Sequence, residues 1–87
     1  MFEWDEEKNK ANASKHGIRF ENTQALFEEN GGISFDINTS VEARFMRIGI
    51  LNGKFWSCIY TTRGENIRLI SCRRSRPKEE AIYHDKN

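Results

Sequence analysis

The residues with the clearest chemical potential are basic side chains near the end of the chain. Arg73 and Arg74 close an apolar stretch that starts at Ile67, and Pro77 then suits the first turn of a helix. The positive charge therefore falls where a strand ends and a helix begins, at an edge that faces outward. Guanidinium and ammonium groups gathered in this way can hold polyanionic phosphate. The cluster consists of Arg68, Arg73, Arg74, Arg76 and Lys78.

The rest of the chain is nearly balanced in charge, and this makes the basic cluster informative. The 87 residues include 14 Lys and Arg and 13 Asp and Glu. This balance argues against a protein that coats nucleic acid generally, because such a protein would be far more basic. Acidic residues crowd the other end of the chain, at Glu3, Asp5, Glu6 and Glu7. This polarity suits a small protein with one anionic and one cationic partner.

Length and cysteine content set further limits. A chain of 87 residues predicts one domain over residues 1–87, without room for a second lobe or a large cofactor cavity. Cys58 and Cys72 lie in apolar, strand-like segments without the spacing of a metal site. We expect two buried reduced thiols, with a disulfide or a metal site as the alternatives. The acidic N-terminus and the lack of a long apolar stretch predict a cytoplasmic protein with no signal peptide, membrane span or cofactor.

Capping and turn residues predict the elements that position these side chains. Asp5 suits the N-cap, and Gly17 the C-terminal end, of a helix over residues 6–16. Asn52-Gly53 predicts a hairpin with a two-residue type I′ turn. We expect strands over residues 2–4, 33–37, 44–51, 54–61 and 67–73, a second helix over residues 21–28, a polar loop over residues 38–42 and a last helix from residue 77. The predicted fold class is α+β, an antiparallel meander with two N-terminal helices and one C-terminal helix.

The hairpin register determines which side chains share a face of the sheet. The two-residue turn predicts the pairs Ile50–Phe55, Ile48–Ser57, Met46–Ile59 and Arg44–Thr61. A four-residue loop over residues 63–66 would add the pairs Thr61–Arg68, Ile59–Ile70 and Ser57–Cys72. In that register Arg44 and Arg68 flank Thr61 at one rim, where their forks of donors could hold a phosphate. Salt bridges from the two arginines to Glu42 or Glu79 are the alternative.

The chain also carries the residues of a known family in the family's order and spacing. The N-terminal part of the pattern comprises Trp4-Asp5, Lys8, Asn12, Lys15-His16-Gly17, Phe20, Ala25 and Phe27. The C-terminal part comprises Arg44-Phe45, Ile48-Gly49, Ile59-Tyr60-Thr61, Ile67-Arg68, Ile70-Ser71, Arg73-Arg74, Glu79 and Tyr83. In these residues the sequence resembles the BrnT-like toxins of bacterial type II toxin–antitoxin systems. The resemblance implies a RelE-like fold, a ribonuclease activity that arrests translation and growth, and neutralisation by a small cognate antitoxin.

Four positions depart from the family's pattern. Members often carry Ser or Thr at the position of Arg19 and an acidic residue at the position of Ala43. They often carry Thr at the position of Arg76 and a basic residue at the position of Glu80. These departures keep a second function open. In that reading the chain is a catalytically degenerate binding module that docks an antitoxin and acts in a DNA-bound repressor complex.

The implied activity sets requirements that the sequence can be searched for. A metal-independent ribonuclease must deprotonate a 2′-hydroxyl, stabilise a crowded dianionic phosphorane and protonate a leaving 5′-oxygen, so it needs a base, an acid and clustered cations. We expect the catalytic residues His16, Arg44, Arg68, Arg74 and Tyr83, and further RNA contacts from Lys15, Arg73 and Arg76. Structural roles compete with each of these assignments. His16 and Lys15 could complement the end of a helix, and Tyr83 could pack in the core. Glu79 suits the start of the last helix better than it suits a general base.

The resemblance also implies a docking surface for the antitoxin. The predicted register puts Phe45, Trp56 and Tyr60 on the sheet face opposite Met46 and Ile59. These aromatics either form a groove for an antitoxin segment or belong to a core that helices cover on both faces. In the first case the segment would also lie across Arg73, Arg74 and Arg76. The antitoxin is expected to be BrnA-like, with a ribbon-helix-helix domain, so operator DNA would be bound only through it.

Overall fold

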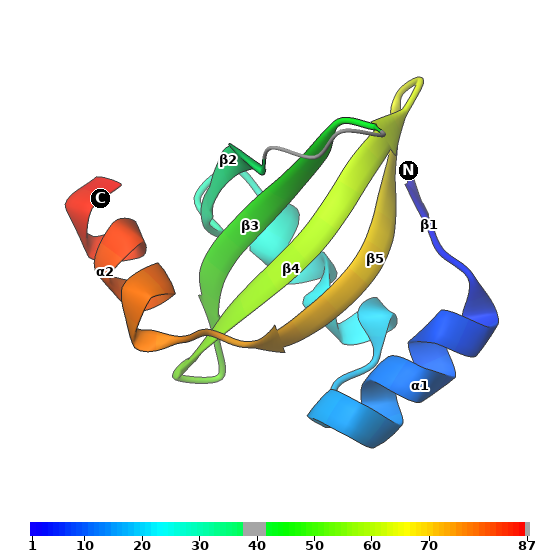
Figure 1. Ribbon diagram of the computed structural model, residues 1–87, viewed down its shortest axis with the longest axis horizontal. Coiled ribbons are helices and arrows are strands. Elements are labelled where there is room, and N and C mark those ends of the chain that lie inside the picture. The colour runs from blue at the N-terminus through cyan, green and yellow to red at the C-terminus, as the bar shows by residue number, and fades with distance from the viewer. Residues whose placement is uncertain (38–41, 87) are drawn as a thin grey trace.

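Five strands form one mixed sheet in the order β1-β5-β4-β3-β2 (Figure 1). The structure is a computed structural model, and it describes residues 1–37 and 42–86, so most of the loop expected over residues 38–42 lies outside the described residues. The elements are β1 (Phe2–Glu3), α1 (Glu6–His16), the 3₁₀-helix η1 (Phe20–Phe27), β2 (Ile33–Ile37), β3 (Arg44–Leu51), β4 (Lys54–Arg63), β5 (Asn66–Arg74) and α2 (Pro77–Lys86). The chain is therefore a single α+β domain. Strands β2 to β5 pair antiparallel, and β1 adds a short parallel pair with β5.

Both ends of α1 are fixed by the residues that the sequence indicated. The Asp5 carboxylate accepts hydrogen bonds from the backbone N–H groups of Glu7 and Lys8, at 2.8 and 3.4 Å. Gly17 follows the helix with φ of 75°, and its N–H donates to the Ala13 carbonyl. A left-handed residue at this position ends the helix because it turns the backbone away from the helical path.

The second expected helix forms as a 3₁₀-helix and starts one residue earlier than predicted. Arg19 occupies its N-cap position, but its side chain makes no capping hydrogen bond and pairs with Glu6 and Glu21 instead. Instead, the backbone N–H of Phe20 donates to the buried Asn9 side chain at 2.7 Å, and Thr23 Oγ1 donates to the Phe20 carbonyl at 2.8 Å. These contacts hold the first turn through tertiary and local side-chain bonds rather than through a cap, which suits the tighter geometry of a short segment.

The β3–β4 hairpin has the predicted turn and register. Asn52 and Gly53 have φ of 53° and 77°, as a type I′ turn requires at both central residues. The pairs Ile50–Phe55, Ile48–Ser57 and Met46–Ile59 are confirmed. The ladder between these strands starts at Phe45–Tyr60, whereas Arg44 pairs with Ile37 of β2.

The β4–β5 register follows the prediction only for the first part of the pair. Thr61 pairs with Arg68 as expected, but a β-bulge between Ile59 and Tyr60 then shifts the register. Because β5 contains one extra residue there, the expected pairs Ile59–Ile70 and Ser57–Cys72 are wrong. The observed pairs are Ile59–Ser71, Cys58–Cys72 and Ser57–Arg73.

The shifted register places the two cysteines opposite each other, where they form a disulfide. Cys58 and Cys72 lie opposite each other with their Cα atoms 4.1 Å apart, and a disulfide joins them in the core. The expectation of two reduced thiols is therefore wrong. Neither cysteine could be placed from sequence spacing alone, because their pairing depends on the bulge.

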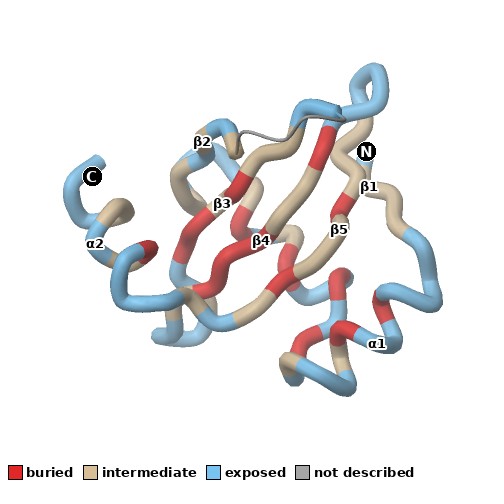
Figure 2. Tube along the Cα trace, viewed as in Figure 1, coloured by how far each residue is buried: buried red, intermediate tan, exposed pale blue. Residues whose placement is uncertain are grey.

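Helices cover both faces of the sheet, so the core is two-sided. Figure 1 shows η1 behind the central strands and α2 beside β3, and Figure 2 shows buried segments concentrated on β3, β4 and β5. The main core cluster comprises Ile18, Phe20, Leu26, Trp56, Cys58, Leu69 and Cys72. On the other face Phe55 packs edge to face on Tyr83 of α2, with ring centroids 5.3 Å apart.

This arrangement corrects the expectation of an exposed aromatic groove. Trp56 is only 9% exposed and belongs to the main core. Tyr60 packs against that core, with its ring stacked on Phe45 at 5.3 Å and edge to face with Phe27 at 5.1 Å. The face with large aromatics is therefore the face that α1 and η1 cover, and Trp56 keeps only a small accessible part of its surface, too little to form an open aromatic groove.

Candidate functional site

The sequence-predicted site residues do not converge on one point. Arg68 lies near the start of β5 and Arg74 at its end, so about 20 Å of strand separates them. Arg44 lies at the start of β3, directly after Ala43, whose carbonyl accepts a hydrogen bond from Thr61, the partner of Arg68 in the β4–β5 pair. His16 lies at the end of α1, beside the second half of β5. The expected pocket of five catalytic residues is therefore divided among separate places on the molecule.

At the rim, both arginines already have carboxylate partners. Arg44 Nε lies 3.6 Å from Glu42 Oε1, which confirms the alternative of a salt bridge to this residue. Arg68 Nη1 lies 3.4 Å from Glu3 Oε1, so its partner is on β1 rather than at Glu79. The Thr61 hydroxyl donates to the Ala43 carbonyl at 2.6 Å. Because both ion pairs reach solvent, a phosphate could compete for the two guanidinium groups. Before a phosphate binds, however, each guanidinium is already paired with a carboxylate.

At the other end of β5, Glu79 organises a buried polar cluster. Arg73 donates from both terminal nitrogens to its carboxylate, at 2.9 and 2.7 Å, and Ser57 donates at 2.8 Å. The backbone N–H of Arg76 donates to the same carboxylate at 2.9 Å, which caps the start of α2. This geometry supports the helix-start role of Glu79, and it makes Arg73 the arginine that braces α2.

The electrostatics of Glu79 argue against a catalytic role. Burial opposes ionisation of its carboxyl, but the hydrogen bonds from Arg73, the Arg76 backbone and Ser57, with the charge of Arg73, outweigh burial and lower its pKa from 4.5 to about 2. The Glu79 carboxylate raises the pKa of Arg73 in turn. A carboxylate this acidic is a poor proton acceptor near neutrality. We assign Glu79 and Arg73 to structure.

Arg74 and Tyr83 lie near this cluster but differ in availability. Arg74 is exposed, its Nε donates to the Phe55 carbonyl at 3.2 Å, and its guanidinium carbon lies 5.7 Å from the centre of the Trp56 ring. Because Arg74 is exposed, an anion could reach its guanidinium group. Tyr83 packs against Phe55 and His84, in accordance with the alternative of a packing role.

A small basic cavity lies between α1 and β5. It has a volume of about 210 Å³ and is lined on the β5 side by Ile70 and Ser71. Three basic side chains of α1 share its wall: Lys8, Lys15 and His16. Lys8 was not among the expected site residues, although its spacing of seven positions from Lys15 places both on one helix face. The cavity brings His16 and Lys15 to the strand that ends in Arg74.

No group of three or more His, Cys, Asp and Glu side chains that could hold a metal ion lies within residues 1–37 and 42–86. Over the same residues, no helix is both long and apolar enough to cross a membrane.

Comparison with known proteins identifies one family. A family model described as the ribonuclease toxin BrnT of type II toxin–antitoxin systems matches residues 4–79. The matched span contains α1, η1, strands β2 to β5 and the first residues of α2. A search of curated proteins gave no match.

Proposed function

The chain belongs to the BrnT family of ribonuclease toxins of type II toxin–antitoxin systems, and from that membership we propose that it is an active endoribonuclease. It would cleave RNA in the cytoplasm and arrest growth until its cognate antitoxin binds. The observation that carries the proposal is the basic cavity between α1 and β5, where an imidazole and two ammonium groups meet. Such a set can supply a base, an acid and positive charge to one phosphodiester.

The reaction can be assigned to named side chains. His16 takes the proton of a 2′-hydroxyl, and the oxygen attacks the adjacent phosphorus. Lys8 and Arg74 stabilise the charge that develops on the phosphorane oxygens. The bond from phosphorus to the 5′-oxygen then breaks, and this oxygen takes a proton from Lys15. The products are a 2′,3′-cyclic phosphate and a 5′-hydroxyl. No metal is needed in this scheme, because side-chain cations supply the positive charge.

Arg44 and Arg68 receive a different role in this proposal. They lie at the opposite end of β5 from Arg74, so they are too far away to contact the same phosphate. We assign them to the RNA backbone several nucleotides from the cleaved bond, where their partly exposed ion pairs with Glu42 and Glu3 would open on binding.

The family implies a cognate antitoxin, and the exposed cations offer it a surface. Arg74 and Arg76 are exposed, whereas Arg73 is held by Glu79. We propose that an acidic segment of a BrnA-like antitoxin covers Arg74 and Arg76 and so blocks access of RNA to Arg74. The antitoxin's own ribbon-helix-helix domain would contact operator DNA, in keeping with the near-neutral charge of this chain.

One structural feature favours the alternative of a degenerate module. Three of the expected catalytic or RNA-binding arginines already have carboxylate partners. Expression in a bacterial host without an antitoxin separates the two functions. The proposed ribonuclease arrests growth with loss of cellular RNA, and His16→Ala restores growth, whereas Lys10→Ala on the same helix does not. Normal growth of cells that accumulate the folded wild-type protein would favour the binding module.

A further inference from the structure

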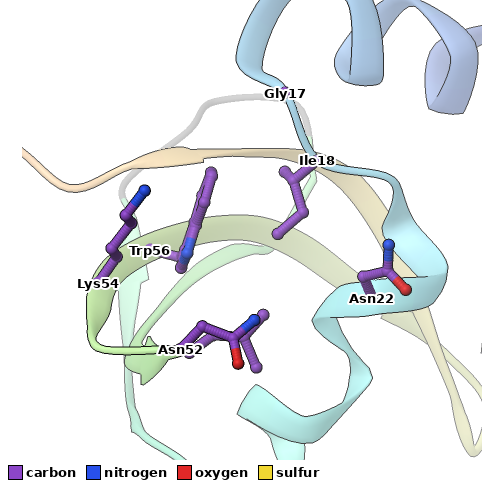
Figure 3. A pocket seen from close by; sticks show the side chains of 7 residues that line it. Gly17, Ile18, Asn22, Asn52, Lys54 and Trp56 are labelled. Carbon is purple, nitrogen blue, oxygen red and sulfur yellow. The ribbon is translucent and has the colours of Figure 1, made fainter.

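A second and larger cavity lies where the start of η1 meets the β3–β4 hairpin, and no function described above uses it. Its volume is about 460 Å³, within the range of sites that bind small organic groups. Ile18, Leu51 and Trp56 form its apolar walls. Figure 3 shows Trp56 standing between Ile18 and Lys54, so an apolar wall and a cation meet at one side of the cavity.

The polar groups of the cavity are available to a ligand. Asn22, Asn52 and Lys54 contribute an amide, a second amide and an ammonium group to the lining. Within residues 1–37 and 42–86, none of these side-chain groups has a hydrogen-bonding or ion-pair partner. None of the described lining residues is acidic. The cavity therefore offers donors, acceptors and positive charge beside apolar walls.

Trp56 connects this cavity to the proposed reaction site. Arg74, the cation that we assign to the reacting phosphate, lies over the Trp56 ring at 5.7 Å. Gly17 and Ile18 of the cavity directly follow His16, the proposed base. A chain that presents a phosphate to Arg74 and His16 would thus bring its neighbouring nucleotide to the cavity.

We infer that this cavity holds one base of the RNA substrate, next to the bond that is cleaved. The inference rests on the proposed ribonuclease function and adds a recognition site to it. A base has a flat apolar face that can contact Ile18, Leu51 and Trp56. Its edge carries donors and acceptors that the amides of Asn22 and Asn52 can match, because each amide offers both. Lys54 then pairs with the phosphate that follows.

Trp56 provides a direct measurement of occupancy. In a Trp4→Phe variant, Trp56 is the remaining tryptophan, and its fluorescence reports on the cavity wall. Titration with 2′-O-methyl hexanucleotides of A, C or U tests binding without cleavage, because the attacking hydroxyl is blocked. We expect a saturable change in Trp56 fluorescence with at least one hexanucleotide. Anisotropy of a labelled hexanucleotide repeats the test on the wild-type protein, in case Trp4→Phe disturbs folding.

Substitution of the polar lining residues tests whether they contact the bound hexanucleotide. Asn22→Ala and Lys54→Ala should each weaken binding about three- to tenfold, the loss typical of one hydrogen bond or one phosphate contact. Asn30→Ala and Lys10→Ala remove an exposed amide and an exposed ammonium group elsewhere, so affinity should stay unchanged.

The outcomes separate this inference from the function on which it rests. Equal affinity of all four variants and the wild type, or no change in Trp56 fluorescence while labelled RNA binds, would overturn the base site, even if the protein cleaves RNA. Binding that depends on Asn22 and Lys54 would support it, even if the protein cleaves nothing. In that case the proposed ribonuclease function fails, and the cavity stands as a base-binding site without a cleaved bond beside it.

Discussion

Two asparagines fasten α1 to the rest of the molecule, where most helices use an apolar stripe. Asn9 and Asn12 are the buried residues of the helix. The Asn12 side chain donates to the carbonyls of Ile18 and Cys72 at 3.0 and 2.9 Å, and accepts from the N–H of Cys72 at 3.0 Å. It thus pairs with the outer edge of β5 as a neighbouring strand would. This contact positions the end of α1, and with it His16, against β5.

Asn12→Ala should therefore destabilise the protein strongly. The substitution removes three buried hydrogen bonds and leaves backbone groups of Ile18 and Cys72 unpaired in the core. We expect a loss of about 3 kcal/mol in the free energy of unfolding, measured by urea denaturation. Asn30→Ala is the control, because Asn30 is exposed. Equal stability of the two variants would mean that the contact with β5 contributes nothing.

Glu79 makes the stability depend on pH in a defined window. Its pKa is lowered from 4.5 to about 2, so the ionised carboxylate stabilises the fold by about 3 kcal/mol above pH 4.5. This contribution declines as the pH falls from about 4.5 towards 2, because the unfolded chain takes up the proton first. Urea denaturation should thus show a large cost of Glu79→Gln at pH 7 and a smaller cost at pH 3. Glu80→Gln, at the next position of α2, should show no such difference. A cost of Glu79→Gln that is constant over this range would contradict the account of the cluster.

The elements that depend on local residues were predicted correctly from the sequence, whereas the contacts between distant parts of the chain were not. Asp5, Gly17 and Asn52-Gly53 act through their own backbone and nearest neighbours, so α1 and the first hairpin could be read from sequence. The bulge in β5 depends on how the strand packs, and no residue type near Ile70 indicates it in the sequence. Because the bulge sets the pairs beyond it, the sequence left the disulfide as an alternative to reduced thiols and did not place Arg73 opposite Ser57. The site prediction named His16 and Lys15, which share the cavity with Lys8, a residue it missed, whereas Arg74 lies at the end of β5 outside the lining of that cavity.

The approach of the turn after η1 to β3 gives a test of this packing. A Cβ atom at Gly49 would overlap the backbone carbonyl of Gly31 and crowd the Leu26 side chain of η1, so the backbone would have to shift. Gly49→Ala should therefore lower the free energy of unfolding by about 3 kcal/mol. Gly64→Ala adds the same methyl group in open space, at a turn with φ of 59°, and should lower it by only about 1 kcal/mol. Thermal unfolding of the two variants checks the difference, and a reversed order would contradict the packing described.

For the whole molecule, the balance of charge shapes the proposed mechanism. The net charge of +1 provides little general attraction to RNA, so affinity must come from the local cations of α1 and β5. Those cations are also the groups that stabilise the phosphorane in the proposed reaction. Binding and catalysis would then share a surface small enough for one antitoxin segment to cover.

Cleavage should persist when divalent metals are removed. Lys8, Lys15 and Arg74 provide the positive charge in the proposed reaction, so the rate in EDTA should equal the rate in magnesium buffer within about twofold. The measurement is gel analysis of a labelled single-stranded RNA after treatment of the protein with chelator. Loss of cleavage in EDTA that added magnesium restores would show that a metal ion takes part.

The most direct test of the account is cleavage of that RNA by the purified protein and by His16→Ala. The wild-type protein should produce fragments with 2′,3′-cyclic phosphate and 5′-hydroxyl ends. His16→Ala should cleave at least about a hundredfold more slowly, because it lacks the group that takes the 2′-hydroxyl proton. Circular dichroism should show that the variant is folded, and Lys10→Ala should cleave at the wild-type rate. Cleavage by folded His16→Ala at the wild-type rate, or no cleavage by the wild-type protein, would contradict the proposed site between α1 and β5.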